Sequence, residues 1–180
     1  TTHYDQPQIV EWFENICSHF KNYDPNIVRK KDFSNISNYT FWYTEDALLR
    51  LSYIQQLIDD HANGCEFFLL CLAETVREVS FTRNGEFKRF KMSEKSLEKF
   101  KPDVFDLFKR KVTRNINGLH QFNATAPAQA KSTICDFNST YGIPDTILPE
   151  GSVDMVVTSP PYGDSHTTVA YGQFSRWANE

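Results

Sequence analysis

The chain has 180 residues and a formal net charge of −4; 40% of its residues are apolar and 14% are aromatic. This length suits one domain, or one domain with a small accessory lobe, and the apolar fraction is enough for a sizeable core. No apolar run approaches the roughly eighteen residues of a membrane-spanning helix, and TTHYDQPQ lacks the charged and apolar regions of a signal peptide. These features argue against a membrane protein and predict a cytoplasmic one. Because the chain starts on Thr1 and stops just after an apolar stretch, we expect a fragment or one part of a split protein.

Charged residues are unevenly distributed along the chain. Residues 77–114 hold twelve Lys or Arg and six Asp or Glu, whereas the rest of the chain is acidic. Such a split indicates a positive face for a polyanion on an acidic body; an ordinary solvated helix surface is the alternative. The four cysteines are widely spaced without a CxxC pair, which predicts free thiols in a reducing compartment and no metal site.

Helical periodicity dominates the first two thirds of the chain. Pro7 suits a first helical turn, Thr44-Glu45-Asp46 is typical of a helix start, and Gly118 is expected to end the last helix. Leu70 is among the side chains expected on an inner face. The second and third helices are predicted to form a helical hairpin. The expected helices span residues 7–22, 44–63, 66–80, 93–99 and 102–118.

Two aromatic segments interrupt this pattern. The cluster at 39–43 is most simply core or an interdomain contact, and a base-stacking platform is the alternative. In Phe81–Met92 the turn dipeptide Asn84-Gly85 lies between aromatic and basic residues, which predicts a short hairpin or loop. Its projecting cations are Arg83, Lys88, Arg89 and Lys91.

The pattern changes after residues 121–131, whose low complexity predicts a linker. The β-branched run Val153–Val157 is typical of a buried parallel strand. We therefore predict an α/β fold with a mainly helical domain over residues 1–120, followed by part of a parallel-sheet domain over residues 132–180.

The predicted strand ends in the sequence Ser159-Pro160-Pro161-Tyr162. In open parallel sheets, ligands bind beyond the carboxyl ends of the strands. Two prolines make a rigid loop with carbonyl acceptors and few donors, Ser159 adds a hydroxyl, and Tyr162 adds a flat ring. This chemistry suits a planar group that carries an NH₂, such as the exocyclic amine of a nucleobase. A polyproline ligand or a plain rigid loop is the alternative.

The stretch Thr158-Ser159-Pro160-Pro161-Tyr162 resembles the catalytic motif of the DNA amino-methyltransferases, which modify cytosine N4 or adenine N6. The flanks Leu148–Asp154 and Val169–Arg176 are similar to modification methylases of restriction systems. The resemblance implies a Rossmann-like sheet that uses S-adenosyl-L-methionine (AdoMet). It also implies that Ser159 and the Pro160 carbonyl bind the amine of a flipped base, with Pro161 stiffening the loop and Tyr162 stacking on the base. Serine at the first position favours cytosine N4.

The family's main AdoMet loop, Phe-x-Gly-x-Gly, has no counterpart here, because none of the seven glycines form a GxG pair. We expect the AdoMet-binding half to precede residue 1 or to reside in another chain, and this chain alone to be inactive. Asp136 is a candidate remnant of the cofactor site, although Cys135 stands where the family often has glycine.

The resemblance gives the basic region a partner, double-stranded DNA. Phosphate contacts are predicted for Arg83, Lys88, Arg89 and Arg114. Two other functions stay open. One is an amino-methyltransferase for RNA or protein glutamine, and the other is a non-catalytic DNA-recognition subunit.

Overall fold

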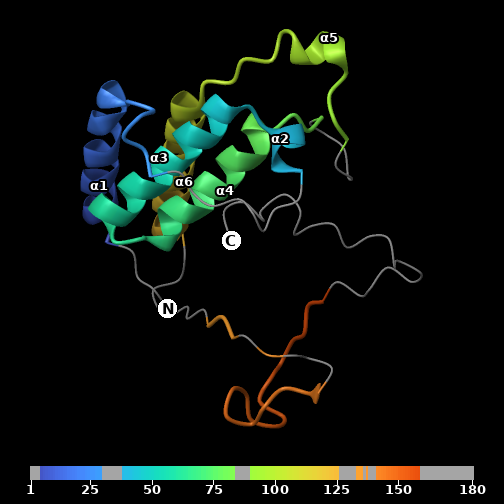
Figure 1. Cartoon of the computed structure of the whole chain (residues 1–180). Coiled ribbons are helices and arrows are strands. Elements are labelled where there is room, and N and C mark those ends of the chain that lie inside the picture. Colours follow the sequence, from blue (N-terminus) through green and yellow to red (C-terminus); the bar gives the residue numbers. More distant parts are fainter. Residues whose placement is uncertain are drawn as a thin grey trace.

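The computed structural model describes residues 5–29, 38–83, 90–125, 133–135, 137 and 141–158. Figure 1 shows a bundle of four longer helices with two short helices at one end. The longer helices are α1 (Gln6–His19), α3 (Glu45–Ala62), α4 (Glu66–Val79) and α6 (Val104–Thr125). The short elements are the 3₁₀ turn η1 (Phe20–Asn22), α2 (Tyr39–Trp42) and α5 (Glu94–Leu97). All five predicted helices are present. None of the described helices is long and apolar enough to span a membrane.

The core lies where the four longer helices face one another. Phe68 on α4 and Phe108 on α6 are fully buried. Phe20 stacks on Phe105 with ring centroids 4.5 Å apart and meets Phe108 edge-on at 6.3 Å. Aromatic pairs of this kind add to the stabilisation that comes from area burial, so the end of α1 is fixed firmly against α6.

Local sequence signals explain the helical hairpin formed by α3 and α4. The Thr44 hydroxyl accepts a hydrogen bond from the Ala47 N–H at 3.1 Å, which caps α3. At its other end Asn63 takes the left-handed conformation, with φ of +51°, and Gly64 follows with φ of +65°. These two residues reverse the chain, as the sequence predicted.

Two details of the helix prediction are wrong. Helix α6 does not end at Gly118 but continues to Thr125, into the segment expected to be a linker. Because Ile116 and Leu119 pack against the core, they offset the roughly 1 kcal/mol that glycine costs in a helix. Leu70, expected on an inner face, is exposed, since α4 turns Phe68 and Cys71 inward instead.

The predicted hairpin is described only at its base. Thr82 and Lys91 form an isolated antiparallel bridge. Beside it the Arg83 N–H donates to the Phe90 carbonyl at 2.7 Å, and the Met92 N–H donates to the Phe81 carbonyl at 2.8 Å. The turn at Asn84-Gly85 lies outside the described residues.

The predicted α/β fold class is contradicted. Within the residues described, that bridge is the only β pairing, and Val153–Val157 is irregular rather than a buried strand. Val157 is 88% exposed, and the segment lies outside the bundle in Figure 1. A strand needs neighbouring strands to pair its backbone groups, and β-branched composition does not supply them. The described structure is helical, with no Rossmann-like sheet.

Candidate functional site

The approach to the methyltransferase-like motif is an exposed turn followed by extended chain. Gly151 has φ of +71°, and the Ser152 hydroxyl donates to the Pro149 carbonyl at 2.7 Å. The described chain ends at Thr158, which is exposed. The four candidate catalytic residues, Ser159, Pro160, Pro161 and Tyr162, lie outside the described residues, so their roles stay predictions.

The candidate contact to a methyl donor at Asp136 lies outside the described residues and stays a prediction. Ile134, two residues before it, is almost fully exposed on irregular chain. The sequence also has no GxG loop.

The candidate DNA-contact residues fall into two separate places. Arg83 lies at the base of the hairpin, with its guanidinium 5.7 Å from the centre of the Phe90 ring. Close to it, Lys91 Nζ lies 3.8 Å from the centre of the exposed Phe41 ring. Cations held over exposed aromatic rings suit contact with nucleic acid. Lys88 and Arg89 belong to the same segment but lie outside the described residues.

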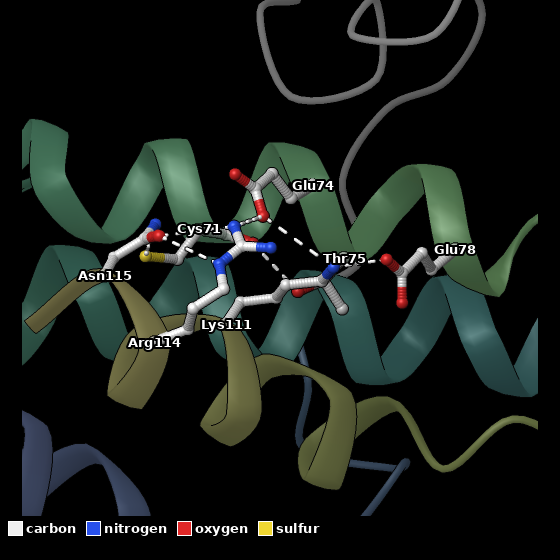
Figure 2. A network of polar contacts seen from close by, with 7 residues as sticks. All are labelled: Cys71, Glu74, Thr75, Glu78, Lys111, Arg114 and Asn115. Atoms are coloured by element: carbon white, nitrogen blue, oxygen red, sulfur yellow. Dashed lines mark hydrogen bonds and ion pairs between the residues drawn. The ribbon is translucent and has the colours of Figure 1, made fainter. Parts of the chain in front are cut away.

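Arg114 lies elsewhere, within a polar network between α4 and α6 (Figure 2). Its guanidinium forms an ion pair with Glu74 and also contacts Asn115 Oδ1. One turn earlier Lys111 pairs with Glu78, and its Nζ lies 3.8 Å from Glu74. Both cations therefore compensate α4 carboxylates. This gives Arg114 a structural role that its place in a basic run did not predict.

Cys71 is the buried member of this polar network between α4 and α6. The Asn115 amide donates to the Cys71 sulfur at 3.2 Å. Burial, only partly opposed by this hydrogen bond, raises the pKa of the Cys71 thiol to about 12. Burial likewise raises the pKa of Cys17 to about 11. Such thiols are protonated and poorly nucleophilic at neutral pH.

The four cysteines, Cys17, Cys65, Cys71 and Cys135, are free thiols in the structure. Among the residues described, no group of three or more His, Cys, Asp or Glu is placed to hold a metal ion.

A surface groove of about 760 Å³ separates η1, the start of α3 and the start of α6. Among its lining residues, Arg50 pairs with Asp46 at 2.8 Å, and the Arg50 guanidinium lies 4.7 Å from the centre of the Tyr23 ring. Lys21 and Lys109 line the groove from η1 and α6. This groove was not predictable from local sequence patterns, because its lining comes from three distant segments.

One comparison with known proteins is informative. The chain is 39% identical over 166 residues to the Type II methyltransferase M.MvaI of Kocuria varians. The chain is a homologue of part of a Type II methyltransferase. The alignment covers 89% of the chain, so it contains α3, α4, α6 and the approach to the motif. It covers only 35% of the relative, and the chain thus spans about a third of that protein's length.

This homology confirms the predicted relationship to the modification methylases, while the amino-methyltransferase subtype stays a prediction. No family model and no solved structure matches the chain.

Proposed function

We propose that the chain is part of a site-specific DNA methyltransferase of a restriction-modification system. Its target is the exocyclic amine of a flipped base, cytosine N4 in preference to adenine N6. The identity to a Type II methyltransferase across nearly the whole chain carries this proposal. Thr158-Ser159-Pro160-Pro161-Tyr162 supports it, because the motif has the acceptors and the flat ring that an exocyclic amine needs.

In this proposal the motif residues hold and polarise the amine. The Ser159 hydroxyl and the Pro160 carbonyl accept its two hydrogens, and Tyr162 stacks on the base to fix its plane. These acceptors draw the nitrogen towards tetrahedral geometry, which frees its lone pair. They also stabilise the positive charge that develops on nitrogen. AdoMet, when bound, would supply an electrophilic methyl group and leave as a neutral thioether. The nitrogen bonds to the methyl carbon as the carbon–sulfur bond breaks, and the positively charged nitrogen then releases one proton to solvent.

The same proposal assigns the partners. Double-stranded DNA contacts Arg83, Lys88, Arg89 and Arg114 through its phosphates. Because Arg114 shares its charge with Glu74, we expect the three hairpin cations to contribute more than Arg114 does. The donor is bound by another part of the same protein or by a separate chain, and a cytoplasmic location completes the proposal.

Calorimetry with AdoMet tests whether binding of the methyl donor needs residues outside this chain. We expect no measurable heat of binding with this chain alone and clear binding with the complete protein. AdoMet binding by this chain alone would show that the donor site does not depend on residues elsewhere.

Methyl transfer to DNA tests the activity itself. The complete protein is expected to transfer radiolabelled methyl groups from AdoMet to DNA and to lose this activity on Tyr162→Ala. Tyr141→Ala is the matched control, because Tyr141 is exposed and lies outside the motif. Label in protein or RNA would favour the second candidate function. DNA binding without any label would favour the recognition subunit.

A further inference from the structure

The groove between η1, α3 and α6 contains more cations than its carboxylates can neutralise. Each of its three carboxylates already has a protein partner. Asp46 pairs with Arg50 at 2.8 Å, and Asp106 pairs with Arg110 at 3.0 Å. Asp103 accepts the Asp106 N–H at 3.1 Å and keeps its negative charge. Four lining cations therefore face three lining carboxylates.

The lysines of the groove lack such partners. Among the described residues, no carboxylate forms an ion pair with Lys21, Lys101 or Lys109, and all three are exposed. Lys109 Nζ lies 5.4 Å from the centre of the Phe20 ring, which holds it beside the groove. The groove thus has a positive surplus that comes from three separate segments.

We propose that this groove binds the phosphate backbone of double-stranded DNA; the inference rests on the proposed function. Its volume of about 760 Å³ is larger than one phosphate group. Its three lysines are exposed, so a ligand in solution can reach their ammonium groups. Lysine ammonium groups are point charges that suit phosphate oxygens without reading base sequence. In this arrangement Arg50 stays with Asp46, and the three lysines contact the strand.

The proposal adds a backbone contact to those of the hairpin cations and places it at the groove rather than at the α4–α6 seam. At the seam Glu74 and Glu78 neutralise Lys111 and Arg114. At the groove the positive charge is available to a ligand. Part of the positive charge of residues 77–114 therefore lies at the groove, in Lys101 and Lys109, joined by Lys21 from outside that region.

The test is the salt dependence of binding to a fluorescein-labelled DNA duplex, followed by anisotropy with this chain. The variant Lys21→Gln/Lys109→Gln removes two groove charges. The charge-matched control Lys95→Gln/Lys99→Gln removes two exposed lysines outside the groove. Each phosphate contact contributes about 0.9 to the slope of log K against log salt, so we expect the groove variant to lower the slope by roughly 1.8. We expect its affinity to fall roughly tenfold or more at about 0.1 M salt.

Lys21→Arg/Lys109→Arg should keep both the slope and most of the affinity, which separates loss of charge from loss of folding. An unchanged slope in the groove variant, an equal loss in the control, or no DNA binding by the unaltered chain would each overturn the proposal. The proposed function fails separately, through absence of methylated DNA with the unaltered complete protein. DNA methylation by the complete protein, together with an unchanged salt-dependence slope in the groove variant, would contradict the groove proposal and leave the proposed function standing.

Discussion

Arg114 on α6 forms an ion pair with Glu74 on α4, although forty residues separate them in the sequence. Asn115, the next residue on α6, contacts the same guanidinium and also donates to the Cys71 sulfur. The seam between these helices therefore combines the polar edge drawn in Figure 2 with a buried apolar interior that includes Phe68 and Phe108. Several consequences of this arrangement for stability can be measured.

The first prediction concerns the two cations of the seam. The Lys111 side chain is only 14% exposed and contacts both Glu74 and Glu78, whereas that of Arg114 is 57% exposed. Lys111→Gln leaves two carboxylates facing each other at i and i+4, and we expect it to cost about 1 kcal/mol or more. Arg114→Gln is expected to cost about 0.5 kcal/mol. Urea unfolding measures both; an equal or reversed order would contradict the account.

The second prediction concerns alkaline pH. Burial raises the pKa of Cys71 to about 12 and that of Cys17 to about 11, from 9.0, so both thiols bind their protons more tightly in the folded protein. This stabilisation is complete below about pH 9 and is lost as pH rises through the folded-state values. The free energy of unfolding should therefore begin to fall near pH 9 and keep falling towards pH 11 to 12, and it should fall less in Cys71→Ala. Val76→Ala is the control, because it opens a cavity on the same helix without removing a thiol. It should keep the full pH dependence.

The third prediction compares two phenylalanines on α6. Phe108 is fully buried against Phe20, whereas Phe122 is 64% exposed. Phe108→Ala should lower the free energy of unfolding by about 3–5 kcal/mol, and Phe122→Ala by less than about 0.5 kcal/mol. Similar losses at the two positions would mean that the far end of α6 is packed against something the described residues do not include.

The fourth prediction concerns the start of α3. The Thr44 hydroxyl accepts the Ala47 N–H, so Thr44→Ala should destabilise the protein by about 1 kcal/mol. Thr44→Ser keeps the oxygen and should retain most of the stability. If serine failed to rescue, the threonine methyl group rather than the cap would matter.

The helices were predictable because their signals are local. Thr44-Glu45-Asp46 contains the cap of α3, and Asn63-Gly64 contains its end, so neighbouring residues suffice to place both. The predicted helix end at Gly118 was wrong because the free-energy cost of glycine in a helix is small. The core contacts of Ile116 and Leu119, which depend on distant helices, outweigh it.

The wrong strand at Val153–Val157 was inferred from the composition of one segment. The same kind of inference missed the ion pair of Arg114, whose phosphate contact stays a prediction. Strand formation depends on partner strands, and the role of Arg114 depends on a glutamate forty residues away. The groove formed by Lys21, Lys101 and Lys109 was not predicted, because these lysines come from separate segments of the chain. By contrast, the methyltransferase-like motif is a contiguous signal, and the homology agrees with it.

The most direct test is nucleoside mass spectrometry of DNA treated with the complete protein and AdoMet. We predict N4-methylcytosine in the unaltered reaction and its loss with Ser159→Ala or Tyr162→Ala, while Tyr141→Ala leaves the yield unchanged. N6-methyladenine as the product would contradict the assignment to cytosine. DNA without any methylated base would contradict the proposed activity altogether.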